Sequence, residues 1–523
     1  MKFGLFYFSF FILNVCYLNA GKVGIFLSTN SNSQLVFGYR LAEILSTQHE
    51  VVLIRAEYNH KTRSFKSPLP NVREIFLEIF NTSAEFDDFA NSERQMFFNE
   101  PTVKIMWDIG AKFQDLYLSG CEKMLNNKKL LTDIENEKFD VIFTHHYDMC
   151  PFAVMHHAKV PKWIYTMSSP IIEMIFRTFG IPSPPSTVPG IFTNTTNQLT
   201  FKERAFNTFT STLSYGMAQL YFRNYDKVIQ QNLGSNFPSI KSLIRKSKLI
   251  FVNDFEFIEY PRPLSSAVIN IGGIGIDITK SLEGEFKTFI EESDKPIVVI
   301  SFGTVADPSV FPQHWKNAFV EFFESNLHIN FIWYFEDSNL KLPKNVLMKK
   351  WIPQPAILAH EKTVAFITHC GYNGLQEAIF TTTPMICIPL FGDQPRNAKL
   401  VEHKNLGTYF SKMRLSGELL TETLKKTLEN KSYHKSLANL RSLLLNRPFN
   451  SSELLLRWTD FAIKHDFDFT FPDVGFVEYY NLDIFVPLGF ITIIGLSFIF
   501  RFLFNLYYWS CCTMAFRDKQ KLQ

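Results

Sequence analysis

Short apolar segments alternate with segments of helical spacing through the first half of the chain. Between the first two of them, residues 34–46 place Leu35, Leu41 and Leu45 on related faces of a helix. A strand–helix–strand succession of this kind favours a parallel sheet covered by helices. The predicted strands of this half span residues 22–27, 51–55, 139–143 and 163–166.

A second series of strands begins after a glycine-containing break at residues 272–285. The pattern therefore predicts an α/β protein with two successive doubly wound domains that face each other across a linker. We place the first domain at residues 21–280 and the second at residues 281–465. The predicted strands of the second domain span residues 297–302, 331–335, 346–349, 365–368 and 385–388.

Both ends of the chain carry membrane-targeting patterns. Lys2, a following apolar run and a small residue at Ala20 predict a signal peptide over residues 1–20. Residues 484–505 are apolar except for Arg501, which predicts a transmembrane helix. The basic tail at residues 506–523 then lies in the cytosol, which gives a single-pass type I topology with both domains in the lumen. Lys519 and Lys521 are similar to a dilysine retrieval signal and favour the endoplasmic reticulum.

Composition supports this organisation. Hydrophobic residues make up 46% of the 523 residues and charged residues 20%, so large cores form and a disordered chain is excluded. A formal net charge of +3, without a basic stripe, argues against a nucleic-acid partner. Four lumenal cysteines are too few for a disulfide scaffold, and their pairing stays open. Glycosylation sequons predict a glycoprotein and occur at Asn81, Asn194, Asn430 and Asn450.

The strongest chemical signal lies between residues 301 and 394. Thr304 ends a small turn after a strand, where the backbone can approach a phosphate. The sequence from His369 through Gly371, Asn373 and Gly374 runs from a strand into a helix, whose N-terminus favours a diphosphate.

Further residues of this region suit a nucleotide and a sugar. Glu377, one helical turn after Asn373, can accept hydrogen bonds from two ribose hydroxyls. Trp351 offers a platform for a flat base, and the Gln354 amide can pair with its edge. Asp393 and Gln394 suit the vicinal hydroxyls of a sugar.

These motifs, Trp351-Ile352-Pro353-Gln354, His369 to Gly374, Glu377 and Gly392 to Pro395, resemble the signature of the UDP-glycosyltransferase family, in its animal UDP-glucuronosyltransferase branch. The resemblance implies a GT-B fold, in which two Rossmann-like doubly wound domains face a cleft and the second domain holds the donor. It also implies an inverting transfer from a UDP-sugar without a metal or other cofactor. It implies that Trp351 and Gln354 bind uracil and that Glu377 binds ribose. It further implies that Thr304, His369, Asn373 and Gly374 hold the diphosphate, and Asp393 and Gln394 the sugar. Tyr334 departs from this pattern, because relatives often have Lys or Arg there.

The acceptor side departs from the family pattern. The family uses a His as the base and an Asp that orients it, and here these positions hold Gln34 and His145. One interpretation makes His145 the base, oriented by Asp148. A second has no side-chain base, so that acceptors are already nucleophilic, and a third has binding without catalysis. Residues 58–118 and 182–225, which are less regular, are interpreted as insertions that shape an acceptor pocket.

The leading hypothesis is a detoxification enzyme that attaches glucuronate or glucose to small lipophilic acceptors. The partners are then UDP-glucuronate or UDP-glucose, the acceptor and the membrane, and homo-oligomerisation is an open possibility. A carboxylated sugar calls for a cationic partner in the first domain or at Arg396. The alternatives are a non-catalytic UDP-sugar- or lipophile-binding protein, motivated by Gln34, and a type I adhesion or receptor protein.

Overall fold

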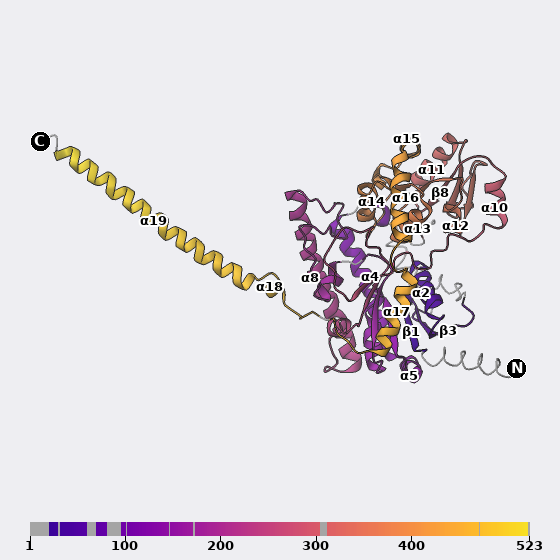
Figure 1. Ribbon diagram of the computed structural model, residues 1–523, viewed down its shortest axis with the longest axis horizontal. Coiled ribbons are helices and arrows are strands. Elements are labelled where there is room, and N and C mark those ends of the chain that lie inside the picture. The colour runs from indigo at the N-terminus through magenta and orange to yellow at the C-terminus, as the bar shows by residue number, and fades with distance from the viewer. Residues whose placement is uncertain are drawn as a thin grey trace, which may run out of the picture. The chain divides into compact units, whose positions relative to one another are not determined.

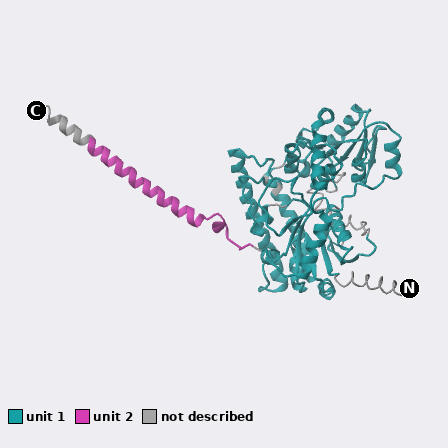
Figure 2. Ribbon diagram, in the orientation of Figure 1, with its two compact units in different colours: residues 1–470 teal, residues 471–523 magenta. Residues whose placement is uncertain are grey.

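The computed structural model describes residues 20–29, 32–59, 69–80, 96–100, 102–145, 147–170, 173–303, 311–469 and 471–520. Apart from Ala20, the predicted signal peptide lies outside these residues. Residues 1–470 form one compact unit and residues 471–523 a second (Figure 2). The first unit contains two parallel sheets, each with its own helices.

The first sheet has seven parallel strands in the order β3-β2-β1-β4-β5-β6-β7. Neighbouring residues of one strand enter different cores: Ile142 belongs to one apolar cluster, and Val141 and Phe143 belong to another. Burial on both faces explains why the central strands of this sheet are almost continuously apolar. The strands are β1 (Lys22–Thr29), β2 (Glu50–Glu57), β3 (Arg73–Glu78), β4 (Val141–His145), β5 (Trp163–Met167), β6 (Ile250–Val252) and β7 (Val268–Asn270).

The four strands predicted for this half of the chain are confirmed, and β3, β6 and β7 add to them. The two less regular regions overlap the long helices α4 and α8, which pack against each other (Figure 1). The helical elements of this part are α2 (Asn32–Leu45), η2 (Met96–Phe98), α4 (Val103–Asn126), α5 (Lys128–Glu137), α6 (Cys150–His157), α7 (Glu173–Thr178), α8 (Phe201–Leu233) and α9 (Ile240–Arg245).

The second sheet has six parallel strands in the order β10-β9-β8-β11-β12-β13. The five predicted strands are confirmed, and β13 extends the edge. The strands are β8 (Ile297–Ser301), β9 (Asn330–Tyr334), β10 (Val346–Lys349), β11 (Thr363–Thr368), β12 (Met385–Cys387) and β13 (Gly407–Tyr409). The helical elements are α10 (Gly284–Glu291), α11 (Gln313–Ser325), α12 (Gln354–Leu358), α13 (Tyr372–Thr381), α14 (Gln394–His403), η4 (Lys412–Arg414), α15 (Gly417–Glu429) and α16 (Lys431–Leu445).

The next helix, α17 (Ser451–Lys464), returns to the first sheet and packs beside α2 (Figure 1). Its buried Leu455 and Ala462 belong to the first sheet's core, although the predicted second domain runs to residue 465. Lys162 Nζ donates to the carbonyls of Ala462 (2.9 Å), Ile463 (3.0 Å) and His465 (2.9 Å). A lysine at this position satisfies carbonyls that a helix end leaves without intrahelical partners.

The second unit contains α18 (Phe476–Tyr479) and α19 (Leu482–Gln520). Within the described residues, Leu482–Ser510 is the one helical stretch long and apolar enough to cross a membrane. It contains the whole predicted transmembrane segment, residues 484–505. Pro487 lies inside the helix, where it lacks the N–H group that would donate to the carbonyl four residues earlier.

Two disulfides resolve the cysteine pairing that the sequence left open. Cys121 of α4 is bonded to Cys150 at the start of α6. Cys370 is bonded to Cys387, which links the segments that follow β11 and end β12.

Candidate active site

The N-terminus of α13 forms the centre of the predicted donor site. Gly371 is the N-cap, with an extended backbone (φ −62°, ψ 143°) and no side chain to occupy the first turn. The first amide N–H groups of a helix have no intrahelical acceptor, so they are available to an anion. Asn373 and Gly374 lie in this first turn, as the sequence predicted.

The His369 imidazole lies between two glycine backbones. A Cβ on Gly303 would approach His369 Nε2 to 2.7 Å, and a Cβ on Gly371 would approach it to 2.5 Å. Glycine is therefore required at both positions, and Gly303 also has a left-handed backbone (φ +74°). Burial lowers the pKa of His369 to about 4, although a hydrogen bond to the Ser301 backbone opposes that shift, so the ring is neutral near pH 7.

The predicted base platform and base-edge residue lie near the carboxyl end of β10. Trp351 follows that strand with 51% of its surface exposed, and Tyr334 at the end of β9 packs edge-on against it, with ring centroids 6.4 Å apart. Gln354 begins α12, and its Nε2 donates to Glu377 Oε2 at 2.7 Å. A hydrogen bond thus links Gln354, predicted to bind uracil, to Glu377, predicted to bind ribose.

Glu377 also contacts the first domain. Its Oε1 lies 3.6 Å from Nη2 of Arg40, which comes from α2 beside the first sheet. Burial raises the pKa of Glu377, although Arg40 and Gln354 oppose that shift. Arg40 carried no sequence signal as a site residue, because a lone arginine on an amphipathic helix is ordinarily a solvated side chain.

Hydrogen bonds from α13 join the two sheets at their carboxyl ends. Asn253, directly after β6, donates through Nδ2 to Asn373 Oδ1 at 2.8 Å. Gln376 Nε2 donates to the Asn253 carbonyl at 2.8 Å, and its Oε1 accepts the Gly273 N–H at 2.6 Å. The helix predicted to bind diphosphate is therefore held by residues of the first domain.

The predicted sugar-binding residues lie at the start of α14. Asp393 accepts a hydrogen bond from Asn397 at 2.7 Å, and burial raises its pKa. Gln394 is buried, and its Oε1 accepts the N–H groups of Leu390 (2.8 Å) and Phe391 (3.1 Å). The Gln394 amide oxygen thus fixes its own loop, and the amide N–H group is the part that can donate to a sugar hydroxyl.

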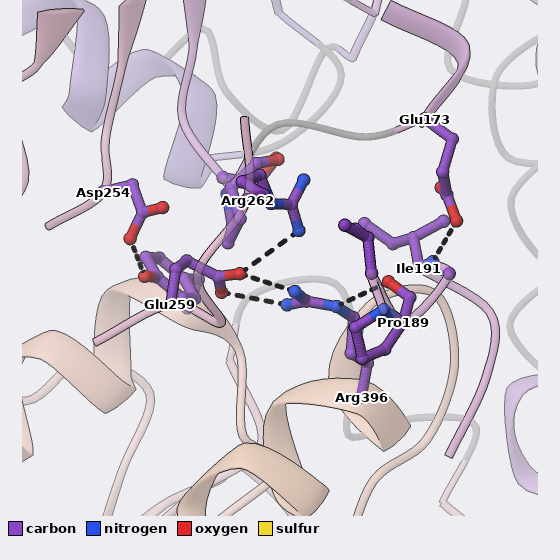
Figure 3. Close-up of polar contacts among 12 residues, drawn as sticks. Glu173, Pro189, Ile191, Asp254, Glu259, Arg262 and Arg396 are labelled. Carbon is purple, nitrogen blue, oxygen red and sulfur yellow. Dashed lines mark hydrogen bonds and ion pairs between the residues drawn. The ribbon is translucent and has the colours of Figure 1, made fainter. Parts of the chain in front are cut away.

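The Arg396 guanidinium is paired with a carboxylate of the first domain. Arg396 is buried, and its guanidinium donates two hydrogen bonds to Glu259, at 2.9 and 2.5 Å (Figure 3). Arg262 approaches the same carboxylate at 3.5 Å. Burial raises the pKa of Glu259, but the two arginines outweigh it and hold that pKa below its ordinary value. Arg396 is thus committed to Glu259 and does not supply the cation suggested for a carboxylated sugar.

On the acceptor side, His145 is the last residue of β4 and is buried. Its Nε2 lies 2.9 Å from Ser168 Oγ, and its ring stacks on Tyr147 at 4.9 Å. Phe37 of α2 packs edge-on against it at 6.2 Å. Gln34, one turn earlier on α2, is also buried, so the two residues that replace the family dyad lie at neighbouring element ends.

Asp148, which one interpretation makes the residue that orients His145, has its carboxylate among other partners. Asp148 accepts hydrogen bonds from the hydroxyls of Ser28 (2.7 Å), Tyr58 (2.9 Å) and Tyr225 (3.4 Å) and from the Cys150 N–H (2.9 Å). Burial raises the pKa of Asp148, and these hydrogen bonds oppose the shift. The carboxylate is therefore occupied within the core of the first domain.

Two further predictions have different outcomes. Thr304 lies outside the described residues. Among the residues that the structure describes, no three His, Cys, Asp or Glu side chains cluster as a metal site, and metal independence stays a prediction.

Comparison with known proteins identifies the family. Residues 26–518 match the family model for UDP-glucoronosyl and UDP-glucosyl transferases. The chain belongs to this family. It is 28% identical to the ugt-48 protein of Caenorhabditis elegans over 503 residues, covering 92% of this chain and 94% of that protein. It is 29% identical to UDP-glucuronosyltransferase 1-2 of Rattus norvegicus over 422 residues, covering 79% of this chain and 76% of that one.

Solved structures show that the family fold is present. A UDP-glucosyltransferase from Polygonum tinctorium that is capable of glucosylating indoxyl superposes on this chain with a TM-score of 0.56 at 16% identity. The match covers 86% of this chain and 99% of that chain. The predicted fold class, two Rossmann-like domains in the GT-B arrangement, is therefore confirmed for this UDP-glycosyltransferase.

Proposed function

We propose that this UDP-glycosyltransferase transfers a hexosyl group from UDP-glucuronate or UDP-glucose to a small lipophilic acceptor, with inversion and without a metal. The observation that carries the proposal is the convergence of Trp351, Gln354, Glu377 and His369 at the carboxyl ends of the second sheet. A half-exposed indole, a buried carboxylate and a free helix N-terminus suit a base, a ribose and a diphosphate.

The donor residues have defined roles in this proposal. Trp351 stacks on uracil and Gln354 bonds its edge, while Glu377 accepts the ribose hydroxyls. The N–H groups at Gly371, Asn373 and Gly374, with His369 and Thr304, bind the diphosphate. Asp393 and the Gln394 amide bind the hexose. Because His369 is neutral near pH 7, it contributes no charge to the diphosphate, and the backbone dipole at the start of α13 supplies the positive potential.

We propose that His145 is the general base that takes the proton from the acceptor. Its hydrogen bond to Ser168 orients the ring without a carboxylate, so the imidazolium formed on proton uptake lacks the stabilisation that an Asp supplies. This arrangement predicts slower turnover, restricted to acceptors such as phenols that lose a proton readily.

The test combines ligand binding with a transfer assay on the full-length chain. Trp351→Ala removes the base platform, which is worth about 1–3 kcal/mol, so UDP should bind about 5- to 150-fold more weakly. Trp107→Ala is the matched control, because Trp107 is 43% exposed on α4 of the first domain. Calorimetry measures UDP binding, and mass spectrometry measures glycoside formation from UDP-glucose and UDP-glucuronate with mixed phenols and amines.

The outcomes separate the candidate functions. Weaker UDP binding in Trp351→Ala alone, together with glycoside formation, supports the transferase. Equal UDP affinity in both variants contradicts the assigned site. UDP binding with no product across the acceptor panel favours a non-catalytic UDP-sugar-binding protein, which the replacement of the family dyad and the occupied Asp148 carboxylate suggest.

We further propose a lumenal, type I arrangement in the endoplasmic reticulum membrane, with a role in detoxification. The apolar helix Leu482–Ser510 supports the anchor. The sequon residues Asn194 and Asn450 are exposed, as glycosylation in the lumen requires, and Asn430 is partly buried. Asn430 and Asn450 also cap α16 and α17 through their side chains. Removal of these sequons singly, followed by gel mobility after expression in animal cells, tests the orientation of the domains.

A further inference from the structure

A short turn of the first domain's chain is inserted into the core of the second. Met96–Phe98, which we call the Phe clasp, lies between β3 and α4 in the sequence. Phe97 and Phe98 are 2% and 7% exposed, and both belong to the apolar cluster built around β8 and α11. A turn of the acceptor-side domain is thus buried within the donor-side domain.

The two phenylalanines have different neighbours. Phe98 packs edge-on against Phe311 (5.1 Å) and Trp315 (5.2 Å), within the core. Phe97 stacks face to face on Phe391, with ring centroids 3.9 Å apart and planes within 15° of parallel. Phe391 belongs to the sugar loop, which we define as residues 390–394 and which contains Asp393 and Gln394.

Lys412 binds the clasp and the sugar loop together. Its side chain is buried, and Nζ donates to the carbonyl of Phe97 at 2.5 Å and to the carbonyl of Leu390 at 2.6 Å. Burial lowers the pKa of Lys412 to about 8. A buried ammonium needs hydrogen-bond acceptors, so Lys412 holds these two carbonyls at a fixed separation.

The sugar loop is therefore held from two sides. Gln394 binds the N–H groups of Leu390 and Phe391 from within the loop. Lys412 and Phe97 hold the Leu390 carbonyl and the Phe391 ring from the clasp side. Gly392, with its left-handed backbone (φ +64°), lies between this anchored part and Asp393, so the anchor sets where the Asp393 carboxylate points.

We infer that Phe97 is a positioning residue for the donor sugar: the Phe clasp holds the sugar loop in the conformation in which Asp393 and Gln394 bind the hexose. This inference rests on the proposed function, because it deepens the role assigned to the sugar loop. The uridine and diphosphate contacts lie on other elements, around Trp351, Glu377 and the start of α13. Loss of the clasp should therefore weaken hexose binding and leave UDP binding intact.

The experiment compares two ligands on the full-length protein. Calorimetry gives the dissociation constants of UDP and of UDP-glucose or UDP-glucuronate, whichever binds the wild type more tightly. In Phe97→Ala, the affinity for the UDP-hexose should fall by about 5- to 100-fold, as expected for misplacing one or two sugar hydrogen bonds, while the UDP affinity stays within about twofold. In transfer assays the KM for the UDP-hexose should rise.

Phe98→Ala is the matched control, because it removes the same side chain from the same turn and core without touching the sugar loop. A merely structural role predicts that both variants lose thermal stability and that neither alters the ratio of the two affinities. Phe97→Leu, which keeps most of the apolar volume and loses the ring stack, serves if Phe97→Ala does not fold. It should shift the ratio in the same direction.

The results separate this inference from the function on which it rests. The positioning role alone is overturned if Phe97→Ala or Phe97→Leu still binds UDP and has the wild-type ratio of UDP-hexose affinity to UDP affinity. An equal change in ratio in Phe98→Ala also overturns it. A wild-type chain that binds no UDP overturns the proposed function and this inference with it.

Discussion

Replacing Glu377 with Gln tests the donor site at its most connected residue. The carboxylate is 7% exposed, accepts Gln354 Nε2 at 2.7 Å and lies 3.6 Å from Arg40 Nη2. Glutamine preserves the volume and one acceptor oxygen but removes the negative charge. Any change in nucleotide binding then reports the charge and its hydrogen bonds, with little change in packing.

The magnitude follows from the two ribose hydrogen bonds that the proposal assigns to Glu377. A hydrogen bond to a charged group contributes about 1.5–3 kcal/mol and a neutral one about 0.5–1.5 kcal/mol. Replacing two charged hydrogen bonds with two neutral ones therefore costs about 2–3 kcal/mol of binding free energy. UDP should accordingly bind Glu377→Gln about 30- to 150-fold more weakly than it binds the wild type. Glu43→Gln on the exposed side of α2 removes an equal charge and should leave UDP binding within about twofold.

A ligand substitution isolates the ribose contact. The wild type should bind 2′-deoxy-UDP more weakly than UDP, because one hydroxyl is missing. In Glu377→Gln that difference should shrink, since the carboxylate that accepted the hydroxyl is gone. Calorimetry at fixed ionic strength measures the affinity of the wild type and of Glu377→Gln for each of the two ligands. Equal UDP affinity in the variant, or an undiminished penalty for the deoxy ligand, would refute the assignment of Glu377 to ribose.

Two other predictions concern the acceptor side and the domain interface. His145→Ala should lower the rate of UDP release with phenols by about 10²-fold or more, because a general base contributes about 10²–10⁴ to the rate. The KM for the UDP-sugar should stay unchanged. An unchanged rate would remove His145 from the mechanism. Arg396→Met should destabilise the fold by about 3–5 kcal/mol, because it removes the closest ion pair of the buried Glu259 carboxylate and leaves the longer contact to Arg262 and a backbone hydrogen bond from Tyr260. Denaturant unfolding measures this loss, and an unshifted midpoint would argue against the buried pair.

The sequence alone determined the alternation of elements and the donor motif. β10 at Val346–Lys349 matches its predicted range, and the other predicted strands overlap the observed ones, because buried parallel strands are short and almost continuously apolar. The donor residues were predictable for a related reason: they follow strand ends within one stretch of chain, and carboxyl ends of parallel strands share one edge. β13, a three-residue strand, carried too little pattern to be recognised.

Only the tertiary structure decided the contacts between distant parts of the chain. Arg40 meets Glu377, Phe97 meets Phe391, Arg396 meets Glu259, and α17 returns to the first sheet. The same holds for Asp148, whose carboxylate is taken by Ser28, Tyr58 and Tyr225 and not by His145. Periodicity reports which face of one element is buried, but it does not report which element packs on that face. Those partners are selected when the two sheets and their insertions pack together.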